Sequence, residues 1–465
     1  MQGKSRLDPA DAREPEISRS SKLAAYVRTP VFHLQLLIVF AVFLGGGGAA
    51  YGLRNLFIQL AALAVLAVNA PHVTRFLREG PRLLVLLAGL TLAVPLLQLI
   101  PLPPAIWQSL PGRELVTETY DIAGLDPQSW LPVSLNPMRT LVAFCATLVP
   151  AIIIAVGTML PVETKVRLVW TLIGATFAAL CLGIVQLSAA NTAGLLFDER
   201  TTPNVLYATF ANRNSTALMF VLALCLIAGL PWPRHKWVLF PMLGIAPLLA
   251  VGTILTQSRT GMVLLILPLA LAGLRAGSYL FKQRLRSKAG PPRIAVWGGA
   301  AAAVMLGLAI AVSAGSGGRA AESFARFADT ATDRPEMWED GLYAAGQYWP
   351  AGAGTGAFDD VFQLHESLEY VSPRRAGRAH NDYIELAIEN GVAGIVVTLL
   401  WLAWAAFNAL RPFPAETLWL RLGAGTGVAA ISLQSLLDYP LRNMTLLSFL
   451  GVLVLVLSDR SRLKT

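Results

Sequence analysis

The stretch AHNDYIELAIENGVAGIVVTLLWLAWAAFNAL, residues 379–410, begins polar and ends in a long apolar run. Its second part, 391–410, holds no charged residue. An α-helix needs about 20 predominantly apolar residues to cross the hydrocarbon core of a bilayer. Blocks of this kind recur along the chain, without the alternation that is typical of membrane β-barrels. They predict an all-α polytopic membrane protein.

The composition supports this class. Of the 465 residues, 55% are hydrophobic and 14% are charged, and the mean hydropathy is +0.57. Soluble domains are about 45–50% apolar and about 25% charged. The net charge of +9 comes from basic residues scattered among short connections, which is typical of membrane orientation and argues against nucleic acid as a partner. Cys145, Cys181 and Cys225 lie in apolar blocks without CxxC spacing, which argues against disulfides and zinc.

We predict about twelve spans. The connections after the even-numbered spans carry basic residues such as Arg75, Arg234 and Arg421, so the positive-inside rule places these connections and both termini in the cytoplasm. Glycine runs at 45–48 and 423–427 weaken the helix prediction beside them. The predicted spans are residues 31–50, 54–70, 82–100, 138–158, 166–188, 214–230, 236–254, 260–274, 294–313, 391–410, 422–437 and 443–458.

The domain organisation follows from this topology. Residues 1–30 mix acids and bases without an apolar core, and we expect a cytoplasmic tail there and not a cleavable signal peptide. Residues 31–458 form the transmembrane domain, and 459–465 form a second cytoplasmic tail. Two substantial loops fall on the outer side: 101–137, rich in Pro and Trp, and 314–390, with thirteen acids against six Arg. A loop as long as the second usually carries function.

Four ionisable residues at the ends of spans are candidates for a site on the outer side: Arg213, Arg259, His380 and Asp438. An arginine at a membrane surface often only extends its charged end to the lipid head groups. However, Arg213 and Arg259 stand among small polar residues, as in FANRNSTALMF and LTQSRTGMVLL. The planar guanidinium binds phosphate oxygens, often through two hydrogen bonds, so the pair suits a diphosphate.

For His380, a structural or surface role is the simpler reading. A functional reading rests on its ordinary pKa near 6.5, which leaves the ring mostly neutral and able to accept a proton. The residues that follow have helical spacing, with Tyr383 and Ile384 on one face and Glu385 and Glu389 on another. His380 is therefore expected just before a helix N-terminus, whose dipole disfavours a protonated ring.

Two motifs resemble sites of other kinds. GAGTGAF at 352–358 looks like a nucleotide loop, but neither a lysine nor a helix signature follows, so we expect a turn-rich ligand or packing loop. HESLE at 365–369 begins like a zinc protease motif, but it has Glu where the second His is needed. The roles of His365 and Glu366 stay open.

Six motifs together resemble the bacterial O-antigen ligase and O-antigen (exopolysaccharide) polymerase family over about residues 135–458. They are, in order, FANRNSTALMF, LTQSRTGMVLL, DRPEMWEDGL, WPAGAGTGAF, HNDYIELAIENGVAGI and SLLDYPL. The resemblance implies a GT-C-like membrane glycosyltransferase of the bacterial inner membrane with its active site on the periplasmic face. It also implies a glycan donor on undecaprenyl diphosphate, with no cofactor and no metal.

The resemblance assigns roles to the candidate residues. His380 resembles the residue that deprotonates or hydrogen-bonds the acceptor hydroxyl, and Arg213 and Arg259 resemble the pair that grips the donor diphosphate. Because the hydroxyl attacks the anomeric carbon opposite the leaving group, the configuration inverts. The supporting positions are Asp438, Arg334, Trp338, Asn214 and Asn381, of which Arg334 and Trp338 are expected to shape the donor pocket.

Several activities fit these motifs. A polymerase extends the lipid-linked glycan, a ligase moves the finished chain to the lipid A core, and a protein O-oligosaccharyltransferase moves glycan to Ser or Thr. LPVSLNPMRT at 131–140 is similar to exopolysaccharide polymerases and favours that activity slightly. A polysaccharide transporter or flippase also fits twelve spans, but no internal repeat is evident. A non-catalytic glycolipid-binding protein would keep the arginines and tolerate loss of His380.

Overall fold

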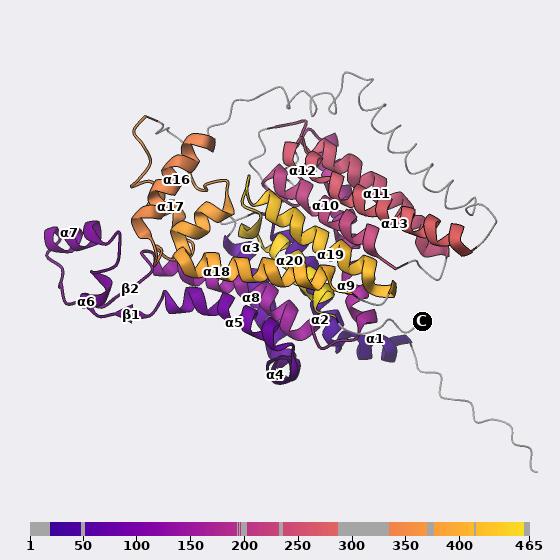
Figure 1. Ribbon diagram of the computed structural model, residues 1–465, viewed down its shortest axis with the longest axis horizontal. Coiled ribbons are helices and arrows are strands. Elements are labelled where there is room, and N and C mark those ends of the chain that lie inside the picture. The colour runs from indigo at the N-terminus through magenta and orange to yellow at the C-terminus, as the bar shows by residue number, and fades with distance from the viewer. Residues whose placement is uncertain are drawn as a thin grey trace, which may run out of the picture.

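A computed structural model of the chain describes residues 19–47, 52–192, 194, 196, 202–231, 236–286, 334–369, 376–412 and 415–459. The described part is mostly helical, and its long helices pack side by side into one bundle (Figure 1). Helices α6, α7, α16 and α17 gather at one end, on the left of Figure 1, while α1 lies toward the other.

The bundle is built from helices that largely begin at side-chain caps or prolines. Thr29, Asn136, Asn212, Ser258, Asn381 and Asn443 each accept a hydrogen bond from a backbone N–H of the first turn that they precede. The helices are α1 (Arg19–Val27), α2 (Pro30–Leu44), α3 (Gly52–Val68), α4 (Ala70–Glu79), α5 (Arg82–Leu97), α6 (Pro104–Trp107), α7 (Glu114–Ile122), α8 (Pro137–Gly157), α9 (Val162–Ser188), α10 (Arg213–Gly229), α11 (Lys236–Leu255), α12 (Arg259–Leu264), α13 (Ile266–Arg286), α16 (Arg334–Tyr348), α17 (Phe358–Phe362), α18 (Asp382–Leu410), α19 (Ala415–Gln434), the 3₁₀ turn η2 (Pro440–Arg442) and α20 (Met444–Ser458). Strands β1 (Pro101–Leu102) and β2 (Leu131–Pro132) form an antiparallel pair.

Eleven of the twelve predicted spans overlap helices, and the ninth, 294–313, lies outside the described residues. So do 1–18 and 460–465 of the predicted tails, and 314–333 and 370–375 of the long outer loop. Among the described residues, four helices are long and apolar enough to cross a membrane, or five if the bent pair α3–α4 is counted as one span. The chain is thus a mostly helical, multi-span membrane protein. The count of twelve and the GT-C fold stay predictions.

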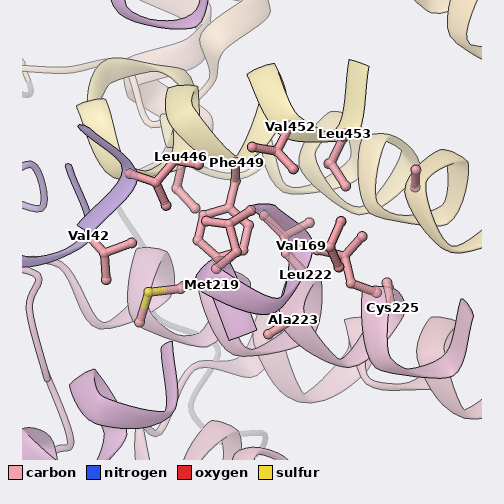
Figure 2. Close-up of a cluster of buried hydrophobic side chains, with 14 of the residues drawn as sticks. Val42, Val169, Met219, Leu222, Ala223, Cys225, Leu446, Phe449, Val452 and Leu453 are labelled. Atoms are coloured by element: carbon pink, nitrogen blue, oxygen red, sulfur yellow. The ribbon is translucent and has the colours of Figure 1, made fainter. Parts of the chain in front are cut away.

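The centre of the bundle is α10, which is buried along almost its whole length. Figure 2 shows Met219 and Leu222 of α10 among Val42 of α2 and Phe449 of α20. All four side chains have 0% exposure. Because lipid tails are as apolar as these residues, such helices associate through close packing and not through exclusion of water.

Helix α19 runs without a break through residues 423–427, where glycines weakened the helix prediction. Two glycines explain how closely it packs against α10. A Cβ on Gly423 would lie 2.5 Å from the carbonyl oxygen of Cys225, and one on Gly229 would lie 2.5 Å from that of Trp419. The missing side chains let α10 and α19 approach closely, as small residues do between membrane helices. At the other glycine run, α2 ends at Leu44 and Gly45 forms its C-cap, as the sequence suggested.

Two predicted connections differ from the structure. Arg421 is not in a solvated connection, because α19 begins at Ala415, and only 2% of Arg421 is exposed. Its guanidinium donates to the carbonyl oxygens of Asp459 at 2.7 Å and Leu457 at 3.1 Å, and to Asn408. It thereby satisfies carbonyls that helix ends leave without partners. The connection that contains Arg75 is helix α4, bent by 75° from α3.

Candidate functional site

His380 stands immediately before α18, in the place that the sequence predicted. Asn381 caps the helix by accepting hydrogen bonds from the backbone N–H of Tyr383 at 3.0 Å and of Ile384 at 3.3 Å. The backbone of His380 has a φ of 50°, in the left-handed region that residues other than glycine rarely adopt. The cap of α18 thus follows directly on an unusual backbone turn that orients the imidazole.

The imidazole meets a buried carboxylate. His380 Nδ1 lies 3.2 Å from Oδ1 of Asp438, whose side chain is 2% exposed, whereas that of His380 is 35% exposed. When Nδ1–H donates to Asp438, the neutral ring has its lone pair on Nε2. The ring of Tyr439 packs edge-on against the imidazole at 5.0 Å between centroids. The pair therefore combines a fixed tautomer with a ring that solvent reaches.

Asp438 also binds the start of α10. Asn212 Nδ2 donates to its Oδ1 at 3.3 Å and its Oδ2 at 3.1 Å. Burial works to raise the pKa of Asp438, but hydrogen bonding and charge interaction with His380, and a hydrogen bond from Asn214, outweigh it and lower that pKa. Burial and the charge of Asp438 raise the pKa of Tyr439 to about 12. Asp438 is thus an ionised carboxylate beside a protonated phenol.

Arg213 and Arg259 each open a helix, and the two helix starts are bonded together. Asn212 caps α10 and Ser258 caps α12. Ser258 Oγ donates to Oδ1 of Asn214 at 2.8 Å, which ties the two starts side by side. Both arginines are half-buried. The hydrogen bonds that Asn212 donates to Asp438 then connect this pair of helix starts with the imidazole.

Helix α16 holds the backbone on both sides of the His380–Asp438 contact. Arg334 Nη1 donates to the carbonyl oxygen of Leu437 at 2.8 Å, and Trp338 Nε1 donates to that of Ala379 at 2.9 Å. Leu437 and Ala379 immediately precede Asp438 and His380. Arg334 and Trp338 are one helical turn apart, so a single face of α16 fixes both segments.

Comparison with models of known protein families gives a match for part of the chain. Residues 244–399 match the sequence model of a protein family described as O-antigen ligase. The match covers about a third of the chain, and through this segment the chain is similar to the O-antigen ligase family. The resemblance found in the motifs is thereby confirmed, and with it a membrane-embedded ligase-type enzyme that joins a glycan donor to an acceptor. No curated protein matches the chain significantly.

The O-antigen ligase segment covers Arg259 and His380, whereas Arg213 and Asp438 lie outside it. The structure nevertheless connects all four through Asn212, Asn214 and Ser258 as described above. The individual roles of these residues, and those of Arg334, Trp338 and Asn381, stay predictions.

A buried charge cluster next to the site was not predicted. Arg442 lies 3.4 Å from Asp382, 3.1 Å from Glu385 and 2.7 Å from Glu389, measured between side-chain nitrogen and oxygen atoms. Glu385 and Glu389 are 0% exposed, although the sequence suggested a separate face for them. Burial works against the charge of Arg442, but these three carboxylates outweigh it and raise its pKa. Arg378 adds a second contact to Glu385 at 3.2 Å. The only signal was the position of Arg442 just after the SLLDYPL motif.

The two motifs that resemble sites of other kinds, GAGTGAF and HESLE, make contacts within the fold. In the GAGTGAF loop, a Cβ on Gly352 would lie 2.5 Å from the carbonyl oxygen of Glu389, and one on Gly354 would lie 2.5 Å from Ser134 Oγ. It is a packing loop. His365 Nε2 lies 3.0 Å from the hydroxyl of Tyr348, and burial lowers the pKa of this histidine. In the described ranges, no three His, Cys, Asp or Glu side chains are grouped to hold a metal.

Proposed function

We propose that the protein is an inverting membrane glycosyltransferase that moves a glycan from undecaprenyl diphosphate to an acceptor hydroxyl at the periplasmic face of the inner membrane. The match of residues 244–399 to the O-antigen ligase family and the apolar helices support this proposal. The observation that carries the chemistry is the contact of 3.2 Å between His380 Nδ1 and the buried carboxylate of Asp438.

In this proposal, His380 is the general base. Asp438 accepts the Nδ1 hydrogen, so Nε2 is the nitrogen that takes the proton from the acceptor hydroxyl. As that proton leaves, the oxygen forms a bond to the anomeric carbon, and the bond from this carbon to the diphosphate oxygen breaks. The electron pair of the broken bond stays on the diphosphate. Ionised Asp438 stabilises the imidazolium that forms, as a carboxylate does in other acid–base pairs.

Arg213 and Arg259 bind the leaving diphosphate. The lipid diphosphate gains negative charge as the glycosidic bond breaks, and cationic donors placed beforehand stabilise that charge in the transition state. The bond between Ser258 and Asn214 supports the proposal, because it keeps the two helix starts that carry these arginines adjacent. With two guanidinium groups and a histidine base, the reaction needs no metal.

The remaining candidates are positioning residues. Asn381 caps α18 next to His380, and Asn214 links Ser258 to the Asp438 end of the site. Arg334 and Trp338 hold the peptide groups that precede Asp438 and His380. We propose that these contacts keep the imidazole and the carboxylate in register during transfer.

The acceptor is either the growing glycan, in a polymerase, or the lipid A core, in an O-antigen ligase. A protein hydroxyl is the alternative. All three acceptors present a hydroxyl, so the same base and the same arginine pair serve each of them.

Surface glycans of a deletion strain separate these activities and test the proposal. A core that carries one repeat, or short exopolysaccharide, identifies a polymerase. Bare core with long chains accumulating on undecaprenyl diphosphate identifies a ligase. Wild type should restore the glycan profile and membrane-inserted His380→Ala should not, whereas full rescue by His380→Ala would leave only a binding function.

A further inference from the structure

A cavity of about 300 Å³ lies between α5, α8, α18, α19 and α20. Of these helices, α8 and α18 are themselves long and apolar enough to cross a membrane. Most of the lining is aliphatic. Representative lining residues are Val94, Ala151, Ile154, Val397, Ile431 and Leu450.

The cavity is long and narrow. On α18 alone it is lined from Asp382 to Ala405, which at 1.5 Å per residue is up to about 34 Å. A volume of about 300 Å³ drawn out over that length suits a single hydrocarbon chain and is too narrow for a sugar ring. A hydrogen bond of 2.9 Å from Trp401 Nε1 to Thr91 Oγ1 joins α18 to α5 beside the far part of the cavity.

The opposite part is polar and is lined by Asp382, Asn390, Thr355 and Arg442. Asp382 belongs to the buried charge cluster, in which Asp382, Glu385 and Glu389 meet the guanidinium groups of Arg442 and Arg378. Three carboxylates against two guanidinium groups leave a formal surplus of negative charge. Burial raises the pKa of Asp382 to about 7, so the surplus is held in part. A nearby ammonium group stabilises the ionised carboxylate of Asp382, whereas an anionic head group disfavours it.

We propose that the cavity binds one acyl chain of a zwitterionic phospholipid, with the amine-bearing head group at the Asp382–Arg442 end. The chain fills a narrow apolar space that packed side chains leave, and so gains dispersion contacts along its length. The site is distinct from the one proposed for the anionic lipid diphosphate, which has Arg213 and Arg259 as its cations. Lipid bound here contacts Tyr383, three residues after His380, and Ser435, three residues before Asp438.

Lipid retention tests the proposal without reference to transfer activity. The full chain is reconstituted in nanodiscs of equal phosphatidylethanolamine and phosphatidylglycerol with a trace of polyprenyl phosphate. The protein is then transferred into detergent, and native mass spectrometry measures the mass of the protein together with the lipid that it retains. We expect one retained phosphatidylethanolamine for each protein. Retention of no lipid, or preference for phosphatidylglycerol or polyprenyl phosphate, overturns the assignment.

Filling the cavity supplies the matched variants. Ala88→Leu combined with Ala151→Leu places added carbons inside the cavity, and we expect retention to fall by about tenfold, equivalent to about 1.4 kcal/mol. Ala403→Leu combined with Ala406→Leu adds the same number of carbons at exposed positions of α18 that do not line the cavity, and this variant should retain lipid like the wild type. Equal retention by the filled variant and this control contradicts the proposal.

A measurement on the wild type covers the case in which the filled variant fails to fold. Phosphatidylethanolamine with a photoreactive group in its acyl chain is cross-linked to the protein in the nanodisc. We expect labelled peptides from both α8 and α18, the walls of the cavity. Labelling confined to outward-facing peptides such as those of α13 overturns the proposal.

Discussion

His380 Nδ1 and Asp438 Oδ1 lie 3.2 Å apart although the two residues are 58 positions apart in the chain. The contact joins the start of α18 to the segment between α19 and α20. Asn212 then joins Asp438 to the start of α10. A histidine, its carboxylate and the helix start that carries Arg213 are therefore one bonded unit.

The first residue to mutate is Asp438, the carboxylate that contacts His380. Asp438→Asn keeps the shape of the side chain but removes the charge that stabilises imidazolium, and its amide can force the wrong tautomer on His380. We expect transfer to fall by about 10²–10⁴-fold, the range of a lost general base. The measurement is the initial rate of glycan transfer by purified protein. Asp359→Asn, in an outer ion pair with Arg139, is the control and should keep most of the activity.

Trp338→Phe removes one hydrogen bond of 2.9 Å to the carbonyl oxygen of Ala379 and keeps an aromatic ring. We expect a loss of stability of about 1 kcal/mol and a larger loss in turnover than in donor affinity, because the imidazole is less well positioned. Separate measurement of kcat and KM distinguishes this effect from simple destabilisation. Trp349→Phe, at a side chain that is 45% exposed, should change neither quantity, and equal losses in both variants would remove the positioning role.

Arg442→Gln leaves Asp382, Glu385 and Glu389 without their shared counter-ion. Removing one partner of a buried ion pair costs about 3–5 kcal/mol, so we expect a marked drop in the midpoint of thermal unfolding in detergent. Arg75→Gln breaks the exposed pair of Arg75 with Glu79 and should have almost no effect. Similar midpoints for the two variants would show that the cluster contributes little to stability.

Gly391 marks the junction at which the polar first part of α18 meets its apolar part. Its φ of 52° and ψ of −139° are not helical, and a Cβ there would lie 2.0 Å from the carbonyl oxygen of Pro350. We expect Gly391→Ala to cost at least about 1–3 kcal/mol through backbone strain. Gly174→Ala, in α9 with nothing within 4 Å of the added Cβ, should be neutral or stabilise by up to about 1 kcal/mol. Unfolding midpoints of the two variants make the comparison.

The sequence singles out His380, Arg213 and Arg259 because each stands in a short polar motif at the end of an apolar block, where an ionisable side chain is costly. The roles of these residues stay predictions. The sequence cannot predict the charge cluster, because Arg442 reaches Glu389 across 53 positions and nothing local reports that pairing. Arg421 is misplaced for a related reason. Hydropathy marks the apolar part of α19, whereas the helix itself begins earlier, at Ala415, and Arg421 within it binds carbonyl oxygens at the ends of α18 and α20.

The central claim is that His380 removes the acceptor proton. The most direct test is a single-turnover assay with purified protein in nanodiscs, a glycan on undecaprenyl diphosphate and an acceptor. It compares wild type, His380→Ala and His365→Ala. We predict that His380→Ala binds the donor like the wild type but transfers about 10²–10⁴-fold more slowly, and that His365→Ala stays active. A folded His380→Ala protein that transfers glycan at the wild-type rate would contradict the account.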